Sequence, residues 1–247
     1  MINKSISVPV VYAERMTTKL AIGRLLVVFL FLHWFFIKPV FAQTAPSASE
    51  IEAYQGLRRA AHQGDMDATK KFIKSGANLE ERDGSGRTPL IVAAFASHEP
   101  IVKLLAEAGA DMNAMEHRAY DIVTIAAVAD DVEMLELALL LGARAGNTTS
   151  PYDGTALIAA AHLGHHEVVD RLIAGGAPLD HINNLNWTAL IEAVILGDGG
   201  LDHIKTVELL LDAGADQSIG DKQGVTAFEH AKSRGYKEMV KLLADGA

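Results

Sequence analysis

Apolar and small residues recur at helical spacing in two short runs within residues 83–114. Thr88 is a favourable N-cap, and Pro89 suits the first position of a helix, where an amide hydrogen would have no partner inside the helix. The residues on the apolar face of this first helix are Leu90, Ala93 and Ala94. A second helix, which ends at Gly109, has an apolar face of Ile101, Val102, Leu104 and Leu105. Because such a pair cannot bury both of its faces alone, the pattern predicts similar neighbours on either side.

The same pattern recurs along the chain. A Gly-Ala pair closes each second helix, with the glycines at Gly76, Gly109, Gly142, Gly176 and Gly214, spaced by 33, 33, 34 and 38 residues. The residues that begin the next first helix are Thr88, Asp121, Thr155, Thr188 and Thr226. A 33-residue period with Thr-Pro-Leu and Ala-Ala at fixed offsets resembles the ankyrin repeat. The resemblance covers roughly residues 50–247 and implies an all-α solenoid of about six helix-turn-helix repeats with short β-hairpin-like loops, a fold that binds proteins.

The repeat boundaries follow from this spacing. We expect repeats at residues 50–81, 83–114, 116–147, 150–181, 183–218 and 221–247. In the third, Ala119 stands where glycine is usual, and Asp121 replaces the capping threonine without loss because aspartate caps as well. In the fifth, Asn186 tolerates the left-handed conformation, and five extra residues lie between the helices, within Leu196–His203.

The first 42 residues differ from the rest, with five basic residues and one acidic residue. Residues 25–37 are apolar except for His33, and a helix of this length reaches only about 20 Å, short of a ~30 Å bilayer core. Val40-Phe41-Ala42 suits signal peptidase, so residues 1–42 are predicted to be a secretory signal peptide, with translation starting at Met1 or Met16. The alternative is an uncleaved inner-membrane anchor. Residues 43–49, rich in Pro, Ser and Ala, are predicted to be a flexible linker.

The charge and the absence of cysteine exclude some classes of partner and of covalent modification. The net charge is −9, and it becomes −13 without residues 1–42. A chain this acidic repels nucleic acid and anionic membranes, so we expect no nucleic-acid partner and membrane contact only through the signal peptide. Because there is no cysteine, there is no disulfide or lipoprotein acylation site. We expect a monomer in the periplasm that binds another protein.

The resemblance places the concave face of the array at the turn residues before each capping residue and at the two residues after Ala-Ala. Apolar and aromatic residues are frequent there, which is typical of an interaction site. The candidate partner-binding residues are Arg87, Phe95, Tyr120, Tyr152, Leu163, Leu185, Trp187, Ile195, Leu196 and Asp198. The alternative is that several of them pack sideways against adjacent hairpins. Gly197–Gly200 are expected to project beside Trp187, either as a functional arm or as a tolerated loop.

Catalytic patterns are absent from the sequence: there is no G-x-S-x-G, no phosphate-binding loop and no cysteine nucleophile. His162, His165, His166 and Glu167 are dense enough for a metal-dependent hydrolase, which is the alternative function, but a helix end followed by a turn separates such side chains. Glu192 would meet His203 only if the insertion folds back. The main prediction is therefore a protein without enzymatic activity or cofactor, with a stabilising, scaffold or immunity role toward a protein partner.

Overall fold

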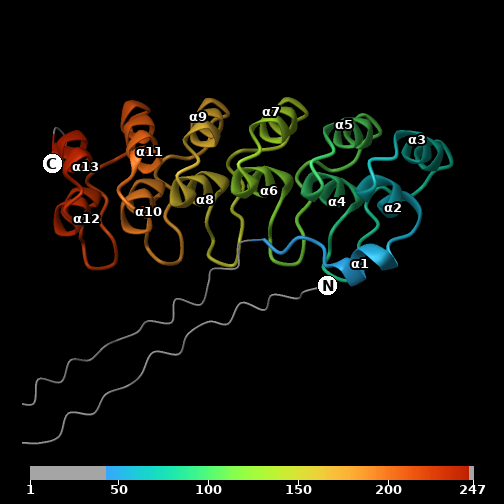
Figure 1. Cartoon of the computed structure of the whole chain (residues 1–247), viewed down its shortest axis with the longest axis horizontal. Coiled ribbons are helices and arrows are strands. Elements are labelled where there is room, and N and C mark those ends of the chain that lie inside the picture. Colours follow the sequence, from blue (N-terminus) through green and yellow to red (C-terminus); the bar gives the residue numbers. More distant parts are fainter. Residues whose placement is uncertain (1–42, 245–247) are drawn as a thin grey trace, which may run out of the picture. The chain divides into compact units, whose positions relative to one another are not determined.

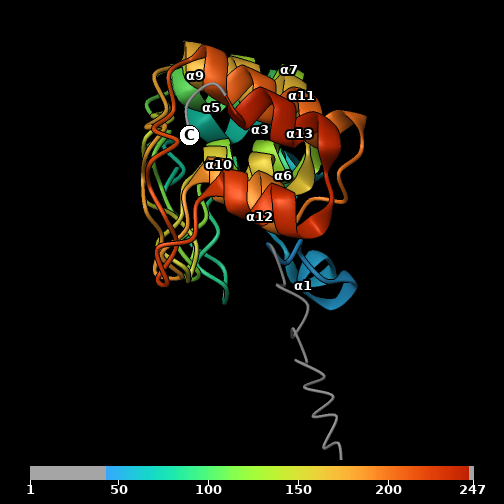
Figure 2. The same cartoon turned by 90° about the vertical axis from the view of Figure 1, so that its left-hand side faces the viewer.

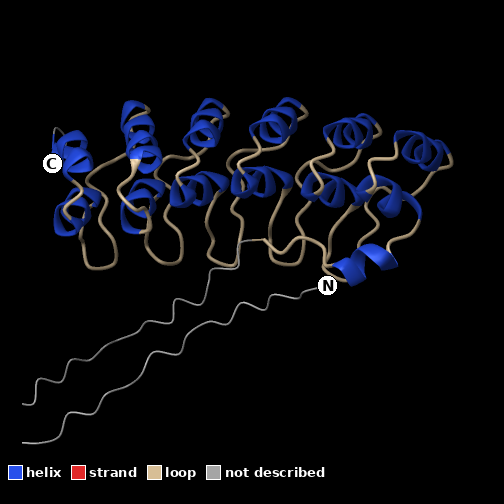
Figure 3. Ribbon diagram, in the orientation of Figure 1, coloured by secondary structure: helices blue, strands red, loops and turns tan. Residues whose placement is uncertain are grey.

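The computed structural model describes residues 43–244, which contain thirteen helices and no strand. Figures 1 and 3 show two rows of helices, with loops that extend from one of the rows. The first helices of the repeats are α2 (Gly56–His62), α4 (Pro89–Phe95), α6 (Ile122–Ala129), α8 (Ala156–Leu163), α10 (Ala189–Ile195) and α12 (Ala227–Arg234). The second helices are α3 (Met66–Lys74), α5 (Glu99–Glu107), α7 (Val132–Leu140), α9 (His166–Ala174), α11 (Leu201–Asp212) and α13 (Lys237–Leu243). Helix α1 (Ala48–Ala53) precedes them. The predicted all-α solenoid of six two-helix repeats is confirmed.

Stacking of the repeats builds one continuous core. Each first helix packs against the first helices before and after it, and the second helices pack in the same order. Small residues occupy equivalent buried positions on the first helices: Ala93, Ala126, Ala160, Ala193 and Ala231. Because alanine takes little volume, the neighbouring helices approach closely and still fill the interior.

The predicted helix starts are confirmed by their caps. In repeats two to six the capping side chain accepts a hydrogen bond from the backbone N–H three residues later; these residues are Thr88, Asp121, Thr155, Thr188 and Thr226. Each such cap contributes about 1 kcal/mol. Caps therefore fix where the first helices begin and, with them, where the hairpins end.

A polar side chain closes the turn of each of four hairpins. In the second repeat, Asp83 Oδ1 accepts hydrogen bonds from the backbone N–H groups of Ser85 and Arg87, both at 2.9 Å. The equivalent oxygens in repeats three, five and six belong to Glu116, Asn183 and Asp221. Neighbouring tips are also linked, because Asn184 N donates to Tyr152 O at 2.9 Å and His117 N donates to Ser85 O at 2.9 Å. The hairpins form a bonded row along the array.

The position two residues before each cap needs a left-handed backbone. Gly86 has φ +81°, and its counterparts Ala119 and Asn186 have φ +62° and +66°. This confirms the predicted equivalence of the three positions. Asparagine adopts this conformation readily, whereas alanine is strained there by roughly 1–2 kcal/mol.

The insertion in the fifth repeat lies between the two helices, as predicted, but not beside Trp187. It follows the C-terminal end of α10, whereas Trp187 precedes the N-cap at the other end, about 10 Å away along a helix of seven residues. The extra residues form a short glycine loop and lengthen α11 to 12 residues, against 9 in α5, α7 and α9. Tyr236 in the sixth repeat donates its hydroxyl to Gly197 O at 2.9 Å. The loop therefore joins the last two repeats and does not lie beside Trp187.

Within residues 43–244, no helix is long and apolar enough to cross a bilayer. The predicted signal peptide, residues 1–42, lies outside the described residues.

We expect Gly197→Ala to lower the free energy of unfolding by about 1–3 kcal/mol, because extra atoms in a packed site force the backbone to shift. A Cβ at this position would lie 2.2 Å from the backbone oxygen of Ala193 and 2.7 Å from the His203 ring. Urea denaturation followed by circular dichroism measures the change. Gly84→Ala is the matched control, since a Cβ there meets nothing within 4 Å. Equal stability of the two variants would contradict this account of the loop.

Candidate partner-binding surface

The first helices and the hairpins form one side of the array, which we call the inner surface; Tyr152, Leu185 and Trp187 lie on its hairpin part. Figure 2 shows the hairpin loops gathered on one side below the first helices and α1 on the other side. The ten predicted residues fall into two groups, one at each end of the first helices. The hairpin group is Arg87, Tyr120, Tyr152, Leu185 and Trp187, and the helix-turn group is Phe95, Leu163, Ile195, Leu196 and Asp198.

Apolar side chains of the hairpin group are available to a partner in repeats four and five. Leu185 is 42% exposed, and Tyr152 and Trp187 are half-buried. Ile182, in the same hairpin and 45% exposed, was not predicted, although an apolar residue directly before a polar turn is the signal that could have indicated it. The bond from Asn184 N to Tyr152 O holds the two hairpins together. These side chains therefore belong to two neighbouring hairpins that are bonded to each other.

In the helix-turn group, Leu163 is 39% exposed and Phe95, Ile195 and Leu196 are half-buried. Phe95 and Ile195, like Trp187, also pack against the core, which agrees with the alternative that several candidates serve packing. Asp198 is exposed at the insertion and accepts hydrogen bonds from Gly200 N at 2.8 Å and from the ring of His203, with its Nδ1 at 3.2 Å. The backbone bond from Gly200 and the neighbouring imidazole hold the pKa of Asp198 below its usual range, although desolvation acts in the opposite direction.

Two predicted surface residues are buried instead. Arg87 is 2% exposed and Tyr120 4% exposed, so neither can present its full side chain to a partner. Arg87 Nε donates to Asp83 Oδ2 at 2.8 Å, and its Nη2 pairs with Glu50 Oε1. The Arg118 guanidinium lies 5.9 Å from the centre of the Tyr120 ring. Repeat periodicity could not reveal the burial of Arg87, because helix α1, which has no counterpart in the other repeats, takes part in it through Glu50.

The partners of Arg87 form a polar network with shifted pKa values. Burial and the hydrogen bond that Tyr54 donates to Asp83 Oδ2, 2.9 Å long, raise the pKa of the Tyr54 phenol. Burial alone would raise the pKa of Asp83, but hydrogen bonds from the Arg87 backbone, Tyr54 and the Ser85 backbone, with the Arg87 charge, hold it below its usual range. Hydrogen bonds from Ser47, then from Ser85, and the charge of Arg87 lower the pKa of Glu50 to about 2.

The stretch predicted to be a flexible linker contacts the inner surface. Residues 43–47 run extended beside α4 and α6 before α1 begins at Ala48, inside the predicted linker (Figure 1). Arg118 Nη1 donates to Thr44 Oγ1 at 3.1 Å, and Gln43 Nε2 donates to the backbone oxygen of Thr124. The signal missed in the sequence is a capping box, in which Ser47 and Glu50 satisfy each other's backbone N–H groups.

The histidine cluster does not converge. His162 Nδ1 lies 3.4 Å from Glu192 Oε2, His165 Nδ1 lies 2.9 Å from the backbone oxygen of Ala127, and His166 Nε2 lies 3.2 Å from Lys205 Nζ. Among residues 43–244, no group of three or more His, Asp or Glu side chains is arranged to hold a metal ion. The arrangement gives no support to a hydrolase that would use residues 162–167.

A pairing of Glu192 with His203 depended on how the insertion folds. The structure does not pair it with His203, whose Nε2 lies 3.0 Å from the backbone oxygen of His162. Glu192 is 5% exposed and accepts a hydrogen bond from Asn183 Nδ2 at 2.7 Å. Because Asn183 also closes the fifth hairpin, Glu192 has a structural role that supports the turn beside Trp187.

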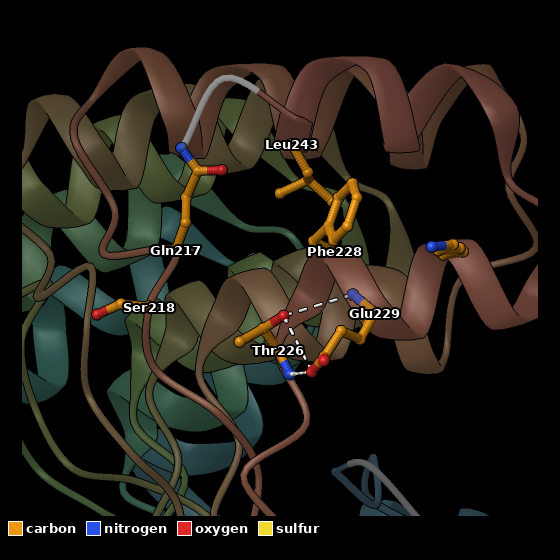
Figure 4. A pocket seen from close by; sticks show the side chains of 7 residues that line it. Gln217, Ser218, Thr226, Phe228, Glu229 and Leu243 are labelled. Carbon is orange, nitrogen blue, oxygen red and sulfur yellow. Dashed lines mark hydrogen bonds between the residues drawn. The ribbon is translucent and has the colours of Figure 1, made fainter. Parts of the chain in front are cut away.

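A pocket of about 490 Å³ lies between the end of the fifth repeat and the last repeat, away from the predicted residues. Figure 4 shows Phe228 and Leu243 on one part of its wall and the Thr226–Glu229 cap on another. Thr226 N donates to Glu229 Oε2 at 2.9 Å, so these polar groups already satisfy each other. The pocket does not extend the inner surface of repeats four and five.

Glu50→Gln is expected to lower the melting temperature near neutral pH and to have progressively less effect in acid. The folded-state pKa of Glu50, about 2, lies below its ordinary value of 4.5. The stabilisation by the charged form is therefore complete above 4.5 and is lost as the pH falls from there toward 2. Thermal unfolding of wild type and variant from about pH 7 to about pH 3 measures this. A difference that stays constant over this range, or equals that of the neighbouring Glu52→Gln, would contradict the assigned contact.

A family model described as "Ankyrin repeats (3 copies)" matches residues 40–118 and 123–221. The ankyrin repeat protein YahD of Escherichia coli strain K12 is 33% identical over 186 residues, which cover 74% of this chain and 92% of YahD. The crystal structure of an ankyrin repeat domain from Acinetobacter baumannii AYE is 40% identical, with a TM-score of 0.74 over 77% of this chain and 96% of that one. A chain in the complex of the predatory endopeptidase Bd0816 from Bdellovibrio bacteriovorus with the immunity protein Bd3460 shares the fold at 24% identity, with a TM-score of 0.66 over 78% of this chain and 99% of that one. The sequence match over most of the chain and the six stacked repeats show that this protein belongs to the ankyrin-repeat family.

Proposed function

We propose that this protein is a non-enzymatic interaction module that binds a protein partner through the inner surface of repeats four and five. Ankyrin repeats are protein-interaction modules. The observation that carries the proposal is the apolar hairpin surface of Tyr152, Leu185 and Trp187, in which Leu185 is 42% exposed. Tyrosine and tryptophan are enriched among the residues that dominate the binding energy of interfaces, and exposed apolar side chains next to them in sequence are typical of an interaction site.

The hydrogen bonds within and between the hairpins of repeats four and five favour binding without a change in the conformation of these hairpins. Asn184 donates from its backbone N to Tyr152 O at 2.9 Å and from Nδ2 to Pro151 O at 3.2 Å. Asn183 Oδ1 accepts from Trp187 N at 3.0 Å. Because the two hairpins are already ordered, they lose less conformational entropy when a partner binds than mobile loops would.

The proposed location is the periplasm, reached through cleavage after Ala42. This part of the proposal rests on the basic residues, the short apolar run and the Val-Phe-Ala sequence of residues 1–42. An N-terminal mass measurement of the protein from its host tests it, since cleavage predicts a first residue of Gln43. An intact N-terminus would instead support the membrane anchor.

Two partner roles are compatible with this surface. An immunity role requires tight one-to-one binding of a toxic enzyme, whereas a stabilising or scaffold role requires weaker binding of a resident enzyme. Titration calorimetry with the captured partner separates them by affinity and stoichiometry.

Tyr152→Ala combined with Trp187→Ala is expected to abolish partner binding, because it removes both aromatic side chains from the proposed contact. Tagged protein from the host envelope is compared with the double variant by mass spectrometry of the co-purified proteins. Leu185→Asp tests the same surface with little effect on folding, since this side chain is 42% exposed.

Leu140→Ala is the control, since Leu140 is 82% exposed on α7, in the row of second helices. Thermal unfolding checks that each variant is folded. A partner retained by both surface variants would reject the proposed surface, while loss from Leu140→Ala alone would assign binding to the second-helix side.

A further inference from the structure

The inner surface of repeats two and three is already occupied by the chain itself. We call residues 43–53 the N-terminal segment; it comprises the extended residues 43–47 and helix α1. Its contacts reach the second hairpin through Arg87 and the third through Arg118, and the first helix of repeat three through Thr124. Residues more than 70 positions apart in sequence, Thr44 and Arg118, are thereby joined.

Polar contacts hold this segment, and apolar burial contributes little. No residue from 43 to 53 is buried, and most are exposed. Arg87 Nη1 lies 3.4 Å from the backbone oxygen of Thr44, and its Nη2 contacts the Glu50 carboxylate. Ser85 Oγ donates to Glu50 Oε1 at 2.9 Å. Hydrogen bonds to charged groups contribute only a modest net free energy each, and no buried apolar side chain adds to them here, so such a segment can exchange with another ligand that offers the same groups.

The part of the second hairpin that the segment contacts, Arg87 with its partner Asp83, is held in place without the segment. Arg87 is 2% exposed, but it keeps a buried counter-ion in Asp83, whose side chain is 6% exposed. Asp83 is in turn bonded by the backbone of its own hairpin. If the segment leaves, Arg87 therefore remains neutralised and ordered, with its outer nitrogens open to a new acceptor.

We propose that the inner surface of repeats two and three is a binding site for an extended polypeptide, and that the N-terminal segment is its resident ligand. A partner segment that takes its place must present a carboxylate to Arg87, as Glu50 does, and carbonyl or hydroxyl oxygens to Arg87 and Arg118, as Thr44 does. This inference extends the proposed interaction surface toward the N-terminus and rests on it for its biological use. The open hairpins of repeats four and five would be contacted without displacement, and repeats two and three only by a partner that displaces the segment.

Covalent attachment explains why a weakly held segment occupies the site. A short tether gives an effective concentration in the millimolar range, so even weak contacts keep the site filled. The apparent affinity for an added ligand is reduced in proportion to the fraction of open sites. Weakening the resident segment must therefore strengthen binding of the same sequence added as a separate peptide.

The test uses the full chain and a fluorescein-labelled peptide with the sequence of residues 43–53, followed by fluorescence anisotropy. Glu50→Gln in the protein loosens the segment and leaves Arg87 and Arg118 unchanged. We expect this variant to bind the peptide about tenfold more tightly than wild type. Glu52→Gln, which removes an exposed charge from the same helix, is the matched control and should behave as wild type. Adding Arg118→Ala to Glu50→Gln should remove most of the gain.

Hydrogen exchange of residues 43–53 in the same samples makes each outcome decisive. Faster exchange in Glu50→Gln together with tighter peptide binding supports the proposal. Faster exchange without peptide binding would overturn it and leave the segment as a structural cap of the first repeat. Unchanged exchange in Glu50→Gln would overturn the required carboxylate contact. Because the peptide is defined, these results do not depend on the partner capture that tests the surface of repeats four and five.

Discussion

The structure depends on the fact that the first helix of an internal repeat is buried on nearly all sides. Six of the seven residues of α4 are buried, and α6, α8 and α10 show the same pattern. Such a helix is stable only between two similar helices and under its own second helix. The end repeats must therefore differ. In α12 only Ala227 and Ala231 are buried, and its last turn carries Lys232 and Arg234.

At the N-terminal end, α1 and residues 43–47 take the place of a missing hairpin. Tyr54, at the end of α1, donates its hydroxyl to Asp83 of the second hairpin, and Glu50 reaches Arg87 of the same hairpin. At the start of the array, the charge of Arg87 is therefore balanced by the carboxylates of Asp83 and Glu50, in a chain whose net charge is −9. The cationic Arg87 side chain thereby meets a carboxylate of the chain's own N-terminal segment.

Turns and first helices are joined by side-chain pairs that differ between repeats while the geometry stays the same. Asn183 donates to Glu192, and His230 lies 2.9 Å from Asp221; each pair is separated by nine positions and joins the same two places in its repeat. In other repeats the helix position holds Val92, Ile125 or Ala159. Because a polar group that is removed from water needs a partner, the buried Glu192 and the half-buried His230 are each matched by a polar residue in the turn. The hairpins that carry Trp187 and Val225 are held by these bonds.

The sequence by itself determined the fold, because each repeat contains its own helix caps, turn residues and apolar faces. Thr88 and its equivalents start helices, Gly86 and Asn186 permit left-handed turns, and apolar spacing defines the buried faces. The structure confirmed these features, and the sequence also indicated the apolar hairpins of Tyr152 and Trp187.

Tertiary structure alone decided the exposure of the candidate residues. Arg87 and Tyr120 are both buried, and Arg87 is in contact with Glu50 of α1, a helix that has no counterpart in the other repeats. Likewise, the backbone oxygen of Gly197 accepts a hydrogen bond from Tyr236 of the next repeat, a neighbour that is distant in sequence and that no local pattern specifies.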